Sequence, residues 1–175
     1  MSAPAPSSST GASRSAARKA DQVASSRSSR LRLAADLRAM AQDPPDGCSA
    51  APVSEDNMYV WWATVIGPEN SEWENAVLTL RLTFPEQYPD KPPRVRFTCE
   101  MFHPNVYSDG NVCLSLLNEN WSAAYSVSSI LTAVRSLLTD PNPNSPANPE
   151  AAQLFSTNYT QYKKRVRRIA QKSLE

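Results

Sequence analysis

A histidine, an asparagine and a cysteine lie close together in one segment of the chain, before and after a turn signal. The segment runs from His103 through Asn105 to Cys113, and Asp109-Gly110 is the turn signal between them. Such a turn would fold Asn105 back toward Cys113 and place a thiol opposite a side-chain amide. An amide N–H stabilises the oxyanion that forms when an acyl group on sulfur is attacked. The segment therefore predicts acyl-transfer chemistry on a cysteine.

The surroundings of Cys113 favour a carrier thiol over a hydrolytic one. No Lys or Arg lies between Val106 and Trp121, so nothing nearby in the sequence would strongly stabilise the thiolate. His103 is the sole histidine, and no acid beside it in the sequence would orient it as a base. We therefore interpret His103 and Pro104 as structural, and we expect Cys113 to be loaded from another thioester.

The composition suits one domain with a tail. The chain has 175 residues, and a hydrophobic share of 41% is enough for a packed core. Three cysteines without paired spacing argue against a disulfide scaffold, and a single histidine argues against a structural zinc site. Residues 31–162 carry fifteen acids against seven basic residues, whereas both ends are basic. We therefore expect no metal, no direct nucleic-acid binding and no membrane binding.

The first part of the chain predicts a tail followed by a helix. Residues 1–28 are rich in Ser and Ala, with little aliphatic side chain to bury, so we expect a disordered basic tail before a core domain at 29–175. Apolar residues at helical spacing predict a helix from about Ser29 to Gln42, ended by the Asp43-Pro44-Pro45 run.

The remainder predicts strands and then helices, which is the order of an α+β fold. Alternating residues predict strands at 58–66, 77–84 and 95–98, arranged as an antiparallel meander. An apolar stripe predicts a helix at 127–138. Asn148-Pro149 then resembles a helix start, and we expect one last helix whose basic run at 163–168 is either a solvated face or a partner surface.

Several motifs together resemble those of ubiquitin-conjugating enzymes, over Ser29 to about Lys172. They are YPDKPPRVRF at 88–97, HPNVY at 103–107, the cysteine at 113, a Trp eight residues later and PNPNSPAN at 141–148. The likeness is greatest to the branch that acts in post-replication DNA repair and histone ubiquitylation. It implies the UBC fold, with an N-terminal helix, a four-stranded antiparallel meander sheet and C-terminal helices.

The resemblance also implies roles for matching residues. Cys113 is similar to the cysteine that accepts ubiquitin from the activating enzyme as a thioester and passes it to a substrate lysine. Asn105 matches the amide that supports isopeptide formation, by oxyanion stabilisation or by ordering the active-site loop. Tyr107 and Ser145 match positions that flank the incoming lysine, and Ser49 matches a non-covalent "backside" ubiquitin site.

Partners follow from the same resemblance. The surface that binds the activating enzyme and RING-type ligases corresponds to Arg30, Arg32, Asp90, Ala123 and Ala124. No bound cofactor is implied, because the activating enzyme is the one that uses ATP. The implied substrates are proteins, histones among them, in DNA repair, chromatin ubiquitylation or protein degradation, and the implied location is the nucleus and cytoplasm.

Some positions depart from the family pattern. Asp90 stands where an aromatic residue is common, and Ala123 stands where Pro usually follows Trp-Ser, so the ligase partner is not fixed. Two residues after Cys113, where Asp is common, this chain has Ser115, which is similar to the residue found there in the branch that conjugates SUMO. Two alternatives stay open: an enzyme of this fold for another ubiquitin-like modifier, and a non-catalytic binding module of this fold.

Overall fold

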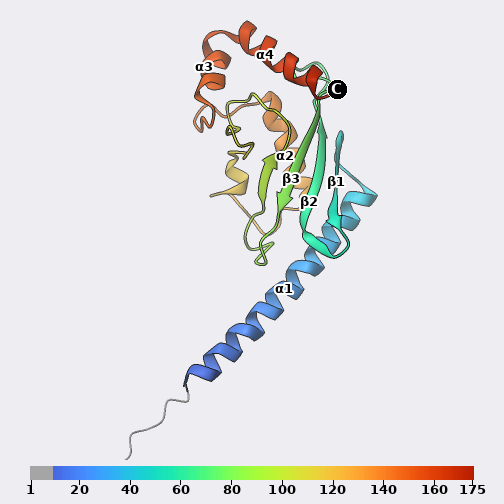
Figure 1. Ribbon diagram of the computed structural model, residues 1–175, viewed down its shortest axis with the longest axis vertical. Helices are drawn as coiled ribbons and strands as arrows, with labels where there is room; N and C mark the ends of the chain where they lie inside the picture. The colour runs from blue at the N-terminus through green and yellow to red at the C-terminus, as the bar shows by residue number, and fades with distance from the viewer. Residues whose placement is uncertain (1–9) are drawn as a thin grey trace, which may run out of the picture.

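Four antiparallel strands form the sheet that supports the candidate site, in a computed structural model that describes residues 10–175. The strands lie side by side in chain order as a meander (Figure 1): β1 (Cys48–Ser54), β2 (Asn57–Ile66), β3 (Val77–Thr83) and β4 (Arg94–Phe97). The predicted α+β architecture, with an N-terminal helix, a four-stranded sheet and C-terminal helices, is confirmed.

The strands β2, β3 and β4 begin and end within one residue of the predicted ranges, whereas β1 gave no strand signal of its own. β1 contains Ala and Ser residues and Pro52, all of which have weak strand propensity. It is an edge strand, paired on one side with β2, and an edge tolerates a proline that cannot donate to the ladder.

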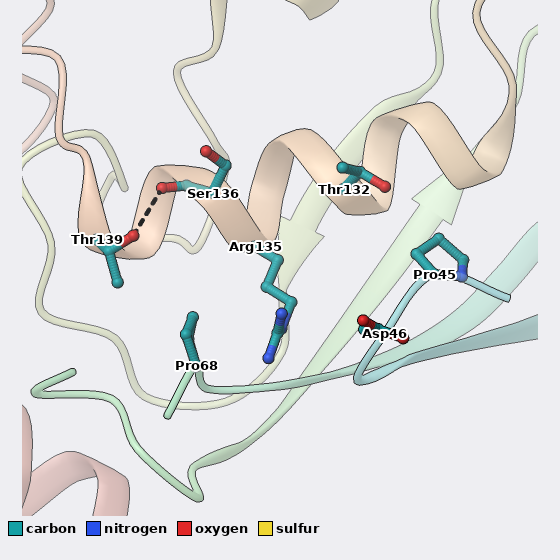
Figure 2. Close-up of a pocket in the computed structure, with 7 residues that line it drawn as sticks. All are labelled: Pro45, Asp46, Pro68, Thr132, Arg135, Ser136 and Thr139. Carbon is teal, nitrogen blue, oxygen red and sulfur yellow. Dashed lines mark hydrogen bonds between the residues drawn. The ribbon is translucent and has the colours of Figure 1, made fainter. Parts of the chain in front are cut away.

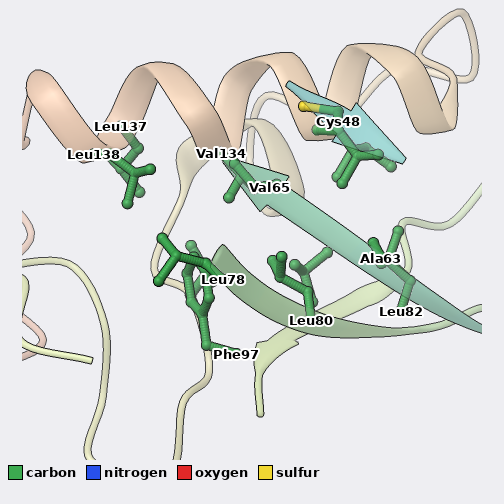
Figure 3. Close-up of a cluster of buried hydrophobic side chains, with 14 of the residues drawn as sticks. Cys48, Ala63, Val65, Leu78, Leu80, Leu82, Phe97, Val134, Leu137 and Leu138 are labelled. Carbon is green, nitrogen blue, oxygen red and sulfur yellow. The ribbon is translucent and has the colours of Figure 1, made fainter. Parts of the chain in front are cut away.

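The core lies between the sheet and α2 (Val127–Thr139). Leu78, Leu80 and Leu82 on β3 are fully buried, while the residues between them are exposed. Figure 3 shows these leucines beneath α2, whose Val134 and neighbouring leucines face the sheet. Burial of each such side chain contributes about 1.5–3 kcal/mol to folding, so this contact fixes α2 on one face of the sheet.

The helix α1 (Thr10–Gln42) begins far earlier than the sequence predicted. The expected helix start near Ser29 is wrong, and the expected disorder does not describe residues 10–28, which are helical. Those residues are rich in Ala, Arg and Ser. They extend a helix already nucleated by packing, and each added residue then costs little. Residues 1–9 of the expected tail lie outside the described residues.

The contacts of α1 show where it meets the body of the molecule. Residues 11–24 are exposed, and this part projects away from the sheet (Figure 1). Ser26 and Ser29 share hydrogen bonds with the Tyr59 hydroxyl on β2, at 3.3 and 2.8 Å. Leu33 is fully buried. The helix is therefore fixed to the sheet from about Ser26 onward.

The C-terminal region holds two helices where one was predicted. The Asn148-Pro149 start is confirmed for α3 (Pro149–Thr157), but the chain breaks there and resumes as α4 (Tyr159–Lys172). Asn158 lies between them with φ −146° and ψ 70°, and its side chain accepts a hydrogen bond from the Gln161 N–H. An asparagine that caps a new helix in this way interrupts the old one. Across residues 10–175 no helix is both long and apolar enough to span a membrane.

Candidate active site

A tight turn brings the His-Pro-Asn segment back onto the chain before Cys113, as predicted. Val106 and Val112 pair across the turn, and the Cys113 N–H donates to the Asn105 carbonyl at 2.8 Å. Gly110 occupies the turn with φ +90°, and a Cβ there would lie 2.1 Å from the Phe97 carbonyl oxygen. Only glycine fits so close to β4, so this residue fixes where Cys113 lies relative to the sheet.

His103 is a structural residue. Its side chain is buried, and Nε2 donates to the Leu137 carbonyl at 2.7 Å while Nδ1 accepts from the Asn105 N–H at 2.9 Å. Burial lowers the pKa of His103 to about 4, so the ring is neutral at physiological pH. With both nitrogens occupied, the imidazole ties α2 to the Asn105 segment and is not available as a base.

The Asn105 side chain is bonded to the loop that follows α2. Its amide donates to the carbonyls of Asn142 and Ser145, both at 2.8 Å, and its Oδ1 accepts from the Asn142 N–H at 2.7 Å. The residue is fully buried. Both amide hydrogens are therefore taken by backbone carbonyls, and this geometry supports the loop-ordering role over direct oxyanion stabilisation.

Pro104 holds the same loop from its other end. Its carbonyl accepts hydrogen bonds from the N–H groups of Ala147 and Asn148, at 2.8 and 3.0 Å. Ser145 is half-buried between these two attachments. The predicted residues Pro104, Asn105 and Ser145 are thus brought together in one hydrogen-bonded wall beside the Cys113 segment.

Cys113 is half-buried, and Tyr107 lies against it. A thiolate at Cys113 would raise the pKa of the adjacent Tyr107 hydroxyl, first through its charge and also through a hydrogen bond between the two side chains. The Tyr107 ring is 48% exposed, so it forms an open wall next to the thiol. Tyr107 stays protonated at physiological pH and cannot serve as a base there.

The other two thiols are placed differently. Cys48 is buried among core side chains under α2 (Figure 3), and burial raises the pKa of its thiol. Cys99 is half-buried, and its sulfur lies 3.8 Å from the Thr79 carbonyl oxygen, so the buried structural thiol is Cys48. Neither adjoins Asn105 in the hydrogen bonds described. Cys113 is the thiol that is partly exposed and whose backbone is also bonded to the Asn105 segment of the ordered wall.

Four of the five predicted ligase-facing residues come together where α1 meets the loop before α2. Arg32 donates to the carbonyls of Ala123 and Tyr125, at 2.9 and 2.7 Å, so it holds the loop before α2 against α1. The Trp121 indole N–H donates to the Pro89 carbonyl at 2.8 Å, which places Asp90 beside the same loop. The exposed residues of this surface are Asp90, Ala123 and Ala124, whereas Arg30 is also exposed but its side chain donates to the Ser26 carbonyl of its own helix.

Sequence reasoning missed the carboxylate behind this surface. Asp36 is 5% exposed, and it accepts hydrogen bonds from Arg32 and from the Tyr88 hydroxyl. The spacing of Arg32 and Asp36, four residues apart on a helix, was a signal that could have found the pair. Ser49 lies elsewhere, exposed on β1 opposite Thr64.

A separate hollow of about 520 Å³ lies between α2 and the turns at the ends of β1 and β2. Figure 2 shows Arg135 reaching from α2 between Pro68 and Asp46, and its Nε donates to the Ile66 carbonyl at 3.0 Å. Its lining includes neither a thiol nor a histidine, so we assign it no acyl-transfer chemistry. Among the described residues no group of three or more His, Cys, Asp or Glu side chains is placed to hold a metal ion.

Comparisons with known proteins agree with this geometry. The family model described as "Ubiquitin-conjugating enzyme" matches residues 32–170. The chain belongs to the ubiquitin-conjugating enzyme family. It is 50% identical over 145 residues to ubiquitin-conjugating enzyme E2 1 of Caenorhabditis elegans, across 83% of this chain and 75% of that protein. It is also 50% identical over 146 residues to ubiquitin-conjugating enzyme E2 2 of Eremothecium gossypii, across 83% of this chain and 85% of that protein.

Membership in the ubiquitin-conjugating enzyme family settles the reaction class. The protein is an acyltransferase, and its partners include ubiquitin, an activating enzyme and a ubiquitin ligase. The matched region covers both the His103–Cys113 segment and the 142–148 loop, so the residues that build the candidate site lie inside the family domain.

Proposed function

We propose that Cys113 accepts ubiquitin and transfers it to the lysine of a protein substrate. In the first step the Cys113 thiolate attacks the thioester carbonyl that joins ubiquitin to the activating enzyme. A new C–S bond forms, and the thiolate of the activating enzyme leaves. In the second step a neutral lysine amine attacks the new thioester, the Cys113 thiolate leaves, and the amine releases a proton to solvent, which leaves an isopeptide bond.

The observation that supports Cys113 is its attachment to the ordered wall. Its N–H is bonded to Asn105, whose side chain holds the 142–145 loop, and Tyr107 lies against the sulfur. We propose that this chain binds no cofactor and that the activating enzyme alone consumes ATP. Charging with ubiquitin, compared among three single Cys→Ser variants, tests the assignment.

The incoming lysine has to lose a proton, and the site offers no strong base for that. Free lysine has a pKa of about 10.4, so only about 10⁻³·⁴ of it is neutral at pH 7. His103 is buried with both nitrogens bonded, and Tyr107 is protonated. Removal of the amine from water lowers its pKa, because burial disfavours the ammonium form. The Tyr107 ring and Ser145 are therefore proposed to desolvate the lysine between them.

The ligase partner is proposed to be of the RING type. Arg32 orders the loop that presents Ala123 and Ala124, next to Asp90. Because Asp90 and Ala123 lack the apolar and rigid contacts that anchor such interfaces, activity with a generic RING ligase should be weak. The double variant Asp90→Phe/Ala123→Pro should increase ligase-stimulated discharge, since a buried aromatic anchor is worth about 2 kcal/mol or more. An unchanged rate with a panel of RING ligases would contradict this.

The biological setting is proposed from the likeness to the repair and chromatin branch. Histones are then among the substrates, the processes are DNA repair, chromatin ubiquitylation or protein degradation, and the protein acts in the nucleus and cytoplasm. Ubiquitylation of reconstituted nucleosomes by the charged enzyme would support this, and modification of no histone, with or without a ligase, would argue against it. Ser49, exposed on β1, is the proposed backside contact for a second ubiquitin.

One residue favours a second candidate function. Ser115 stands two residues after the cysteine, as in the SUMO-conjugating branch, so SUMO is the alternative modifier. Parallel charging reactions with ubiquitin or SUMO, each with its own activating enzyme, decide between them. We expect charging with ubiquitin alone.

A further inference from the structure

Three arginines line up on the outer face of the sheet, the face opposite α2. Arg81 on β3 lies directly across from Arg96 on β4, and Arg94 lies two residues before Arg96 on the same face, opposite Thr83. All three side chains are exposed. Cross-strand partners lie about 5 Å apart, and residues two apart on a strand lie about 7 Å apart. The three positive charges therefore share one small patch, which we name the arginine patch.

The arginine patch has little internal compensation. Among residues 10–175, ion pairs to carboxylates involve Arg32, Arg165 and Lys172, and none involves the three arginines of the patch. Asp109 lines the same hollow, and hydrogen bonds from Asn111 hold the pKa of its carboxyl below the usual value, with a smaller contribution from the charge of Arg96. The Asp109 carboxylate is already bonded to the N–H and side-chain amide of Asn111, at 3.0 and 2.7 Å.

Placing like charges directly opposite each other destabilises a sheet. The Arg81–Arg96 pair breaks that rule without a compensating contact in the described chain, which is a pattern typical of functional positions. The patch borders a hollow of about 390 Å³, lined by Arg81, Thr83, Arg94, Arg96, Asp109 and Asn111. Guanidinium groups around a hollow of this kind bind carboxylates in a paired, two-point geometry.

The hollow also adjoins the segment that carries the proposed acceptor. Asn111 lines it, pairs with Arg96 and precedes Cys113 by two residues. Two extended residues span about 7 Å, so the hollow lies on the order of 10 Å from the thiol, which an extended peptide covers in about three or four residues. Ser49, on β1, is two strands away from Arg81 and three from Arg94 and Arg96, about 10–14 Å across the sheet.

We propose that the arginine patch selects substrates by binding Asp or Glu side chains close to the acceptor lysine. This rests on the proposed function of Cys113, and it adds a preference for lysines in acidic sequences. A nucleic-acid ligand fits less well, because the surrounding body from 31 to 162 carries fifteen acids against seven basic residues and would repel a phosphate backbone beyond the patch.

The test is single-turnover discharge of ubiquitin from purified, charged full-length enzyme to short single-lysine peptides. One peptide has acids before the lysine, one has acids after it, and a third has glutamines at all those positions. We expect discharge to at least one acidic peptide to be about three- to tenfold faster than to the glutamine peptide at low salt, as a few exposed ion pairs allow. The preference should shrink in 0.5 M salt, where the screening length is only about 4 Å.

Three triple variants test the patch, and the two glutamine variants among them each remove three positive charges. Arg81→Gln/Arg94→Gln/Arg96→Gln should abolish the ratio between acidic and glutamine peptides, whereas arginine-to-lysine changes at the same positions should retain most of it. Lys164→Gln/Arg167→Gln/Arg168→Gln removes three exposed charges from α4 and should leave the ratio unchanged.

Three results would overturn the inference: equal rates for all peptides with wild type, loss of the ratio in the α4 variant, or an equal fall for acidic and glutamine peptides in the patch variant. Failure of the enzyme to charge at Cys113 would instead refute the proposed function. The two failures are therefore distinguishable.

Discussion

Replacement of Asn105 separates the two roles that an active-site amide can have. The Asn105 side chain makes three hydrogen bonds to the backbone of the 142–145 loop. Asn105→Ala removes all three, and each such bond contributes about 0.5–1.5 kcal/mol net. Asn142 is exposed and Ser145 half-buried, so water can satisfy part of what is lost. We expect a loss of about 2 kcal/mol and a fall in melting temperature of about 4–8 °C for a chain of this size.

A second variant sharpens the test. Asn105→Asp keeps the acceptor for the Asn142 N–H but turns a carboxylate oxygen toward the carbonyls of Asn142 and Ser145. Oxygen facing oxygen is repulsive, so this variant should be at least as destabilised as Asn105→Ala. Hydrogen exchange of the 142–148 amides should rise in both, and discharge to free lysine should slow while charging continues.

The refuting result is specific. If Asn105→Ala discharges ubiquitin slowly while its melting temperature and loop exchange match those of wild type, the amide acts on the reaction itself and the loop-ordering interpretation is wrong. Melting curves, exchange mass spectrometry and single-turnover discharge on the same preparations provide all three readings.

Three further predictions concern the residues around the site. Arg32→Ala removes two hydrogen bonds to the loop before α2, and it removes the ion-pair partner of Asp36. We therefore expect denaturant unfolding to show a stability loss of about 2 kcal/mol, and we expect slower ligase-stimulated discharge. Full ligase stimulation in this variant would contradict this. Tyr107→Ala should move the rate-versus-pH curve for lysine discharge to higher pH with charging intact, because the desolvating wall is lost; Tyr107→Phe should keep the wild-type curve, and superimposable curves for all three would refute the idea. The pKa of His103 is about 4 in the folded state and 6.5 in the unfolded state, so the unfolded state takes up a proton first and stability falls as pH drops from 6.5 toward 4. We expect about 2 kcal/mol less stability at pH 5 than at pH 7 from this residue. A His103→Gln variant whose stability has the same pH slope as that of wild type would contradict this.

Much of the site was predictable because its signals are local. The Asp109-Gly110 turn, the Asn148 cap and the alternation along β3 each depend on residues adjacent in sequence. The bonds from Asn105 to Asn142 and Ser145 join segments almost forty residues apart, and no periodicity reveals them. The resemblance to the family identified Asn105 and Ser145 as site residues, whereas the structure showed which backbone groups Asn105 is hydrogen-bonded to.

The errors have physical causes of two kinds. Residues 10–28 carry little aliphatic side chain beyond Val23, yet Ala and Arg favour helix once α1 is nucleated by packing farther along the chain. Asn158 ends one helix and caps the next, which the apolar stripe from Phe155 to Ile169 conceals because both helices bury the same side. In both cases hydrogen bonding along the backbone outweighed the pattern of apolar residues.

The assignment of Cys113 is tested most directly by charging the chain with ubiquitin, its activating enzyme and ATP. Wild type, Cys48→Ser and Cys99→Ser should each form a ubiquitin adduct that reductant removes. Cys113→Ser should form a slower adduct that resists reductant and is cleaved by alkali, as an oxyester is. A reductant-sensitive adduct on Cys113→Ser, or loss of charging in folded Cys99→Ser, would show that the acceptor is another cysteine.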